Sequence, residues 1–445
     1  MVCDATAAFL TARKRIRPGC ANSGMTRDRT FVIVGASLAG AKAAETLREE
    51  GFDGRIVLIG AEPDRPYERP PLSKEYLRGD AGREKVYVHD EGYYAAHDID
   101  LQLGRTAVSL DPDAKEIELD DGERVEYDRL LLTTGARPNS LPVSGSDLDG
   151  VLALRSVEDS DALRDRLSRA ESLVVIGSGW IGAEVAASAR HLGVDVTMVG
   201  HEAMPLEHVL GPQVGAVYRD VHADHGVRMC METGVEAFEG VGRVERVHTS
   251  DDRELACDLV VVGVGVHPRS ELAARAGLAV DDGILVDEHL RTTSPGVFAA
   301  GDVASARHPF YNRRVRVEHW SNALNQGPAA ARSMLGEREP YERLPYFFSD
   351  QYDVGMEYTG LAGPRDCVVF RGDPSAREFI AFWLSGDRVV AGMNVNVWDV
   401  VEPIQQLIRD RVPVDVDRLA DPDVALEDVR VTAASSPTPS ERPRA

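Results

Sequence analysis

The order of apolar and polar residues repeats one pattern twice along the chain. In each copy an apolar run enters a glycine-rich turn and an alanine-rich stretch follows: residues 31–40 read FVIVGASLAG, and residues 173–182 read LVVIGSGWIG. A short apolar run bounded by a turn predicts a buried strand, and the alanine-rich stretch predicts a helix that ends near Gly51 or Gly193. A second apolar run follows in both copies, so the pattern predicts two β-α-β units.

Three small residues in each turn have the spacing of a dinucleotide-binding motif. They are Gly35, Ser37 and Gly40 in the first copy, and Gly177, Gly179 and Gly182 in the second. The first position permits a tight turn, the second lets the backbone approach a pyrophosphate, and the third allows close packing of helix and strand. The helix N-terminus adds unsatisfied N–H groups that attract phosphates. We therefore expect two dinucleotide sites, and the alternative is a β-α-β unit without a ligand.

Acidic residues and small-residue turns follow several apolar runs. Glu62 and Glu202 stand at equivalent places, about 20 residues beyond the glycine turns, where such motifs carry a ribose-binding acid. Residues 129–138 (RLLLTTGARP) and 259–268 (LVVVGVGVHP) each close a strand on a glycine and a proline. The candidate ligand contacts in these two segments are Thr134, Gly135 and Gly265. Asp302 follows a short apolar run and could accept hydrogen bonds from sugar-like hydroxyl groups; the alternative at all these places is an ordinary turn.

Length, composition and charge limit the class of protein. A chain of 445 residues suggests about three domains of ~150 residues, and 43% hydrophobic with 28% charged residues indicates globular domains. The formal charge of −23 argues against a nucleic-acid partner, because binding phosphates requires clustered Lys and Arg. No apolar run approaches the ~18 residues that cross a bilayer, so we expect a cytoplasmic protein.

The cysteines and the chain ends carry less information. The five cysteines are Cys3, Cys20, Cys230, Cys257 and Cys367. They include no C-x-x-C pair, which argues against a disulfide framework, a zinc site or an iron-sulfur cluster, and we expect no metal centre. Near the start, a basic cluster follows a short apolar stretch instead of preceding it, unlike a signal peptide. We expect Met25 to be the natural start and both the leader and the Pro- and Ser-rich end to be disordered.

The motifs together carry a resemblance to a known family. In order they read GASLAG, RPYERPPLSK, LLLTTGARP, GSGWIGAE, GVGVHP, TTSPGVFAAGD and RVEHWSNALNQG. From about Phe31 to about Pro413 the chain resembles the FAD-dependent NAD(P)H:ferredoxin reductases, the putidaredoxin reductase and rubredoxin reductase type, which lack the redox disulfide of the wider pyridine nucleotide-disulfide oxidoreductase superfamily. Apoptosis-inducing factor is a more distant relative.

The resemblance implies an α/β fold of two Rossmann-like dinucleotide-binding domains, as in glutathione reductase, and a C-terminal α/β domain. The boundaries that we expect are a disordered leader at 1–28, a first part of the FAD-binding domain at 29–150, an NAD(P)H-binding domain at 151–272, a second FAD part at 273–338, the C-terminal domain at 339–430 and a disordered tail at 431–445.

The stretch ERPPLSKEYL, residues 68–77, lies where the disulfide reductases of the wider fold carry reactive cysteines, and it contains none. The resemblance therefore implies that electrons leave the flavin directly. NAD(P)H delivers two electrons as a hydride and an iron-sulfur protein accepts one at a time, and a flavin converts between these modes. The implied function is reduction of a ferredoxin that serves a cytochrome P-450 or a ring-hydroxylating dioxygenase.

The resemblance also assigns roles to single residues. The residues expected at FAD are Gly35, Ser37, Gly40, Glu62, Arg69, Lys74, Thr134, Gly135, Asp302, Glu318, His319, Trp320 and Phe348. The residues expected at NAD(P)H are Gly177, Gly179, Gly182, Glu184, His201, Glu202 and Gly265. Catalytic roles fall on Lys74, Glu184 and Trp320, and we expect Glu184 to pair with Lys74 across the domain interface. The alternatives are a solvated lysine and an exposed acid in the first helical turn. At Phe348 many relatives have tryptophan, so a hydrogen bond from the indole N–H is lost here.

Three points stay open in the sequence. Gly200 occupies the place directly after the second strand of the second motif; Glu202 favours NADH, whereas His201 could tolerate the extra phosphate of NADPH, and we favour NADH. A basic run between Asp302 and Trp320 could dock an acidic ferredoxin, although a solvated loop or local ion pairs would look the same. Its arginines are Arg307, Arg313, Arg314 and Arg316. The alternative functions are a rubredoxin reductase or NADH oxidase, or a flavoprotein with a signalling or binding role.

Overall fold

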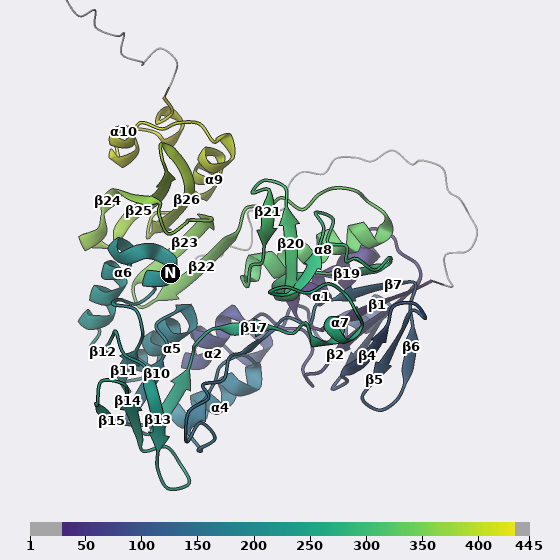
Figure 1. Ribbon diagram of the computed structural model, residues 1–445, viewed down its shortest axis with the longest axis horizontal. Coiled ribbons are helices and arrows are strands. Elements are labelled where there is room, and N and C mark those ends of the chain that lie inside the picture. Colours follow the sequence, from purple (N-terminus) through teal and green to yellow (C-terminus); the bar gives the residue numbers. More distant parts are fainter. Residues whose placement is uncertain (1–28, 432–445) are drawn as a thin grey trace, which may run out of the picture.

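The computed structural model describes residues 29–431, and the expectations for the leader, Met25 and most of the tail lie outside this range. Two parallel five-stranded sheets dominate the fold, and each is built from one copy of the repeat (Figure 1). The first sheet has the order β19-β7-β1-β2-β3, with β1 Thr30–Val34, β2 Arg55–Gly60, β3 Ile99–Leu103, β7 Arg129–Leu132 and β19 Val297–Ala299. The second has the order β12-β11-β10-β16-β9, with β9 Val151–Leu152, β10 Ser172–Ile176, β11 Asp195–Val199, β12 Arg228–Cys230 and β16 Leu259–Val262.

Each repeat strand is central in its sheet and buried. In β1, Val32 pairs with Val57 on one side and with Leu130 on the other, and it is fully buried. Strands of parallel sheets are buried on both faces, which explains why these strands are continuous apolar runs in the sequence. The helices after the two turns are α1 Leu38–Glu49 and α5 Trp180–His191, and Gly51 and Gly193 follow them with positive φ. The two predicted β-α-β units are therefore present.

Smaller antiparallel sheets complete the two repeat units. One consists of β4 Ala107–Asp111, β5 Glu116–Leu119 and β6 Arg124–Glu126, and its counterpart of β13 Val235–Glu239, β14 Arg246–Thr249 and β15 Glu254–Ala256. The strands β8 Ala136–Pro138 and β17 Val266–Pro268 pair antiparallel and connect the units. Beyond them, β18 Ile284–Val286, β20 Ala304–His308 and β21 Arg313–Val315 form a further sheet, and the helices α7 Glu271–Arg275 and α8 Trp320–Leu335 pack nearby.

The C-terminal part is an antiparallel five-stranded sheet with helices on it. Its order is β22-β23-β26-β25-β24, with β22 Tyr346–Gln351, β23 Val354–Gly360, β24 Cys367–Asp373, β25 Glu378–Ser385 and β26 Arg388–Val395. The helices α9 Val401–Asp410 and α10 Val416–Ala420 belong to the same region. Within residues 29–431 no helix has both the length and the apolar composition that crossing a membrane requires.

Two apolar cores join the parts of the chain to one another. Leu72 and Tyr76, from the segment after β2, pack in one cluster with Leu163 and Val185 of the second repeat unit. The short elements of this segment are the 3-10 turn Pro70–Ser73 and the helices α2 Glu75–Arg78 and α3 Tyr93–Ala96. The helices α4 Val157–Leu167 and α6 Glu207–Asp224 belong to the second unit. Of these, α6 shares a core with the C-terminal sheet, against which it lies in Figure 1.

We predict that Leu72→Ala lowers the free energy of unfolding by about 2–5 kcal/mol, because it leaves a cavity in the core between the first and second units. Leu72 is 2% exposed. The measurement is denaturant unfolding followed by fluorescence, and Leu192→Ala, at a leucine that is 38% exposed, serves as the control. Equal stability of the two variants would contradict a shared core at this place.

Candidate functional site

The first glycine turn is packed so tightly that only glycine fits at two positions. Gly35 has φ +119°, and a Cβ there would lie 2.1 Å from the carbonyl oxygen of Thr133. A Cβ at Gly40 would lie 2.1 Å from the carbonyl oxygen of Gly35, so helix and turn are in direct contact. Ser37 is the N-cap of α1, and in the described chain its hydroxyl makes no capping bond. The turn therefore presents a serine hydroxyl and the N-terminus of a helix, a combination that suits a phosphate.

The second glycine turn repeats this geometry. Gly177 has φ +104° and would meet Gly263, and a Cβ at Gly182 would lie 2.1 Å from the Gly177 carbonyl oxygen. Gly179, the N-cap of α5, has open space in front of it. Beside the turn, Ser178 donates a hydrogen bond of 3.2 Å to the carboxylate of Glu202, which is half-buried at the end of β11. Glu202 therefore stands where an acid can bind a ribose.

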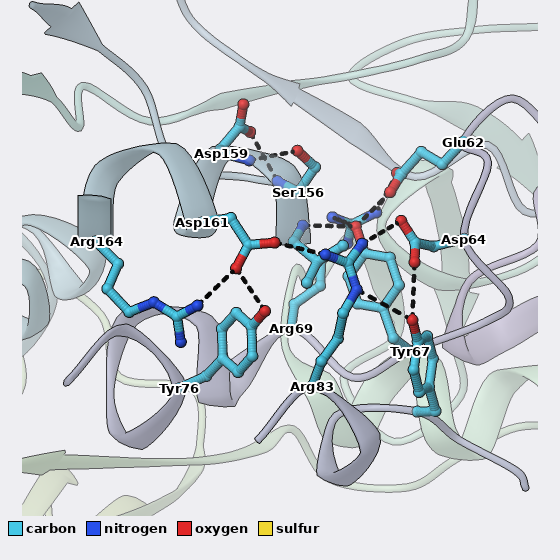
Figure 2. A network of polar contacts seen from close by, with 12 residues as sticks. Glu62, Asp64, Tyr67, Arg69, Tyr76, Arg83, Ser156, Asp159, Asp161 and Arg164 are labelled. Atoms are coloured by element: carbon cyan, nitrogen blue, oxygen red, sulfur yellow. Dashed lines mark hydrogen bonds and ion pairs between the residues drawn. The ribbon is translucent and has the colours of Figure 1, made fainter. Parts of the chain in front are cut away.

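Glu62, at the equivalent place of the first unit, is bound by two side chains from the following segment. Arg69 Nη2 donates to Glu62 Oε1 at 3.0 Å, and the hydroxyl of Tyr67 donates to Glu62 Oε2. Tyr67 also accepts a hydrogen bond of 3.2 Å from the backbone N–H of Val157, and Figure 2 shows this group of contacts. Burial raises the pKa of Tyr67, so its hydroxyl stays a donor. Glu62 and Arg69, both expected at FAD, are brought together.

Arg155 connects this group to Asp302. Arg155 belongs to none of the sequence motifs, so its role was not predicted. Arg69 Nη1 donates to the backbone carbonyl of Arg155, whose own guanidinium makes a 2.7 Å ion pair with Asp302. The guanidinium also lies 3.7 Å from where a Cβ of Gly135 would be. Burial lowers the pKa of Arg155, and the nearby charge of Arg69 lowers it further. Two neighbouring arginine side chains thus stand between two carboxylates, Glu62 and Asp302.

A second arginine-centred group ties the same segment to α4. Arg83 donates to Asp161 of α4 at 2.5 Å and to Asp64 at 2.7 Å, as Figure 2 shows. Asp161 also accepts from the hydroxyl of Tyr76 at 2.6 Å. The hydrogen bond to Asp64, together with one to Tyr87, raises the pKa of Arg83 against the effect of burial. This network holds residues 62–87 against the second unit. The stretch without cysteine, residues 68–77, lies within this segment and is held in the same way.

Lys74 and Glu184 form a buried ion pair, which confirms the expected pairing. Lys74 Nζ lies 2.8 Å from Glu184 Oε2, and both side chains are about as buried as core residues, at 6% and 5% exposure. Ser73 donates to the same carboxylate oxygen, and Ser349 of β22 donates to the other at 2.7 Å. Glu184 is therefore not an exposed first-turn acid: it accepts from residues of the first unit and of the C-terminal sheet.

Aromatic side chains pack on the Lys74 side of this pair. The rings of Trp320 and Phe348 meet edge to face at 5.9 Å, and the ammonium of Lys74 lies 5.8 Å from the Phe348 ring. His319, the N-cap of α8, packs on Phe347 at 4.3 Å, and burial lowers its pKa to about 4, so its ring is neutral near pH 7. Phe348 thus lies close to Lys74 and Trp320 packs on Phe348, whereas His319, the third expected flavin contact, packs on the neighbouring Phe347. The fourth, Glu318, is ion-paired with Arg316.

Comparison with known proteins agrees with this geometry. Residues 29–327 match the model of the pyridine nucleotide-disulphide oxidoreductases, and residues 346–430 match the reductase C-terminal model. The chain belongs to the pyridine nucleotide-disulphide oxidoreductase family. The family and the fold class expected from the motifs are thereby confirmed, and the family uses FAD and NAD(P)H as cofactors.

Relatives in this family are reductase components of oxygenase systems. Rhodocoxin reductase of Rhodococcus erythropolis is 39% identical over 399 residues, which cover 89% of this chain and 93% of the relative. The ferredoxin–NAD(+) reductase component of the anthranilate 1,2-dioxygenase system of Burkholderia cepacia is 41% identical, with 89% and 98% covered. Among solved structures, the covalent putidaredoxin reductase–putidaredoxin complex superposes with a TM-score of 0.87 at 38% identity, over 91% of this chain and 98% of that one.

Two further residues of the oxidoreductase that were expected to contact the cofactors, Thr134 and Gly265, lie at the connection between the two repeat units. Thr134 donates its hydroxyl to the backbone carbonyl of Arg269 at 2.7 Å, whereas Thr133, which the motifs did not single out, bonds the Gly35 carbonyl. Gly265 accepts a hydrogen bond from the backbone of Asn139 beside an open hollow of about 480 Å³. The hydroxyl proton of Thr134 is therefore already used in a hydrogen bond within the protein.

The residues present fit the cofactors of the family. In both turns a Cβ at the first or the third glycine would collide with backbone, whereas the middle positions, Ser37 and Gly179, stand at the helix N-termini, with open space beside Gly179. Within residues 29–431, the buried atoms His319 Nδ1 and Arg155 Nε have no hydrogen-bond partner. Buried polar atoms are normally satisfied, and these two, one beside Asp302 and one at the start of α8, leave room for bonds to a polar ligand. Asp302 and Glu62, each ion-paired with an arginine, would offer carboxylates to hydroxyl groups of such a ligand.

We predict that Asp302→Ala weakens retention of FAD by about 1.5–3 kcal/mol, because it removes a charged acceptor and leaves Arg155 without its partner. The measurement is FAD affinity by fluorescence titration of the flavin-depleted protein. Asp100→Ala, which removes an exposed carboxylate paired with Arg55, is the control. Unchanged affinity in the Asp302 variant would remove Asp302 from the flavin site.

Proposed function

We propose that the protein is an NAD(P)H:ferredoxin oxidoreductase that supplies electrons to an oxygenase. The observation that carries this proposal is the absence of cysteine from residues 68–77, next to the Lys74–Glu184 pair, in a chain similar to ferredoxin reductases. Of the cysteines in the described range, Cys230 and Cys257 are buried in the second unit and Cys367 is exposed on β24. A thiol relay at this position is excluded by the sequence, so electrons leave toward an external acceptor.

Each unit of the chain supplies one part of the site. Bound FAD accepts a hydride and releases electrons singly. Gly35, Ser37 and Gly40 would receive its pyrophosphate, and Glu62 and Asp302 its hydroxyl groups. The turn from Gly177 to Gly182 would bind the nicotinamide nucleotide. Lys74, which is ion-paired with Glu184, would place one positive charge beside the flavin ring, where negative charge develops on reduction.

We further propose NADH as the physiological donor and the cytoplasm as the location, where this coenzyme is available. Glu202 supports NADH, because a carboxylate that already accepts from Ser178 would bind a ribose hydroxyl and repel a 2′-phosphate. His201 is exposed at the same strand end.

The basic run contributes two arginines to a docking face for an acidic ferredoxin. Arg307 of β20 and Arg314 of β21 stand directly opposite each other, and among the described residues neither forms an ion pair. Within residues 29–431, Arg314 donates only to the backbone carbonyls of Val286 and Ser305, so no carboxylate of this range neutralises its charge. Arg316 is paired with Asp282 and Glu318, which is the ion-pair alternative. Arg313 pairs with His308 in the ladder and lies on the other face by the strand alternation.

The decisive experiment is NADH-driven reduction of cytochrome c with and without a [2Fe–2S] ferredoxin from an oxygenase system. The proposal requires that the ferredoxin greatly accelerates cytochrome reduction. Oxygen consumption that is fast and indifferent to the ferredoxin would instead identify an NADH oxidase. A slowly reduced flavin that no ferredoxin reoxidises would favour a signalling or binding role.

We predict that wild-type protein prefers NADH to NADPH, and that Glu202→Ala lowers kcat/KM for NADH about ten- to a hundredfold through the lost charged hydrogen bond. The same change should leave kcat/KM for NADPH equal or higher, since repulsion of the phosphate is removed. Glu207→Ala, at a neighbouring acid on α6, is the control. A wild-type preference for NADPH would contradict this assignment.

We predict that Arg307→Ala combined with Arg314→Gln raises KM for ferredoxin and flattens its dependence on ionic strength, because steering by local positive charge is lost. Reduction of ferricyanide by NADH should stay unchanged. Arg313→Ala removes an exposed arginine of the same strand from the opposite face and is the matched control. Equal salt dependence in the double variant and the control would refute docking at this face.

A further inference from the structure

A line of buried polar side chains leads away from Glu184 into the contact between α6 and the C-terminal sheet. Ser349 Oγ lies 2.7 Å from Glu184 Oε1, and Gln351 Nε2 lies 3.3 Å from Ser349 Oγ. Gln351 Oε1 lies 3.0 Å from Nε2 of His222 on α6, and Nδ1 of this histidine lies 3.2 Å from the hydroxyl of Tyr352. Four hydrogen bonds thus connect Tyr352 to the carboxylate that holds Lys74.

The interior members of this line are fully removed from solvent. His222 is 0% exposed, Gln351 and Ser349 are 1% exposed, and Glu184 is 4% exposed. Polar groups buried to this degree are costly unless they are bonded, and each has its partner in the line. The ring of His225 stacks on Tyr352 at 3.7 Å and fixes the outer end. The line of hydrogen bonds is therefore part of the packed interface between α5, α6 and β22.

The chemistry of the groups allows only one direction of donation. An ionised carboxylate has no proton, so Ser349 must donate to Glu184 and must accept from Gln351. The amide nitrogen of Gln351 then faces Ser349, and its oxygen faces His222. His222 must therefore carry its proton on Nε2, and Nδ1 accepts from Tyr352. Burial lowers the pKa of His222 to about 4, which keeps the ring neutral near pH 7, as this pattern requires.

The amide group of Gln351, at the centre of the line, determines whether the line can conduct protons. Gln351 does not readily release a proton, so the line is unsuited to conduct protons from the ion pair to the surface. It fixes orientation instead, because every donor points toward Glu184 and every interior member has one allowed state. We propose that Gln351 and His222 are positioning residues that hold the Glu184 carboxylate, and through it the Lys74 ammonium, in the geometry used for flavin reduction.

This inference rests on the proposed role of Lys74 beside the flavin, but its central claim concerns protein groups alone. If the carboxylate sets the direction of donation, a change at Glu184 must alter the tautomer of His222, although three hydrogen bonds separate the two residues. A neutral amide at position 184 can donate to Ser349. The line can then run in either direction, and His222 can carry its proton on Nδ1.

The first experiment reads this coupling without any assay of activity. Protein labelled with 15N-histidine is examined by NMR at pH 7, with His222→Gln used to assign the signals of His222. Wild type should show the Nε2–H tautomer alone, and both Glu184→Gln and Ser349→Ala should show a mixture of tautomers. Ser188→Ala removes a buried hydroxyl that bonds Ser73 near the ion pair but lies outside the line, and it should change nothing.

A His222 tautomer that stays pure Nε2–H in both Glu184→Gln and Ser349→Ala would overturn the inference, as would an Nδ1–H tautomer in wild type. Two different variants are used because Glu184→Gln leaves Lys74 charged and buried, and only folded protein with native circular dichroism is compared. Ser349→Ala interrupts the line and removes one hydrogen bond to Glu184, but it keeps both charged side chains of the ion pair.

The second experiment reads the effect on the site. Gln351→Met keeps the length of the side chain and removes both hydrogen bonds; it should slow the reduction of bound FAD by NADH about tenfold in stopped-flow measurements, with KM for NADH unchanged. A reduction rate equal to wild type would overturn the positioning role. Lys74→Met separates the two proposals: if it leaves the reduction rate unchanged, the proposed role of Lys74 fails, whereas the tautomer coupling is decided by NMR alone.

Discussion

The buried pair of Lys74 and Glu184 is the contact on which the arrangement of the three units depends. Lysine comes from the segment after β2, glutamate from α5, and the serine that completes the carboxylate from β22. Removing one partner of a buried pair leaves an uncompensated charge, which is strongly destabilising. The ion pair forms only when the segment after β2, α5 and β22 are packed against one another. The distance between Lys74 and Glu184 therefore depends on the packing of all three units.

Apolar packing explains why this polar contact is stable. The segment around Leu72 shares a core with the second unit, and α6 shares a core with the C-terminal sheet. These cores exclude water from both sides of the pair, which strengthens the attraction between charges and raises the cost of separating them.

The sequence predicted the parts of this structure that depend on local rules. The glycine turns around Gly35 and Gly177 follow from steric limits within a few residues, and their packing distances show why no other residue fits. The resemblance supplied the pairing of Lys74 with Glu184, which is confirmed. Arg155 and Ser349 were missed, because neither belongs to a motif and each acquires its partner only through tertiary packing. For the same reason the sequence left open whether Arg316 docks a partner or forms a local ion pair, and in the structure it is paired with Asp282 and Glu318.

The position of β19 in the first sheet has a consequence for synthesis of the chain. This strand and helix α8 come after the second unit in the sequence, yet they complete the core that contains β1, α1 and β7. On the ribosome, the strands of the second unit emerge with their sheet complete at Val262, while the first sheet still lacks its edge strand. The first unit thus begins before the second but is finished after it. During translation its strand β7 lacks the neighbour β19 for roughly the time needed to add the residues between these two strands.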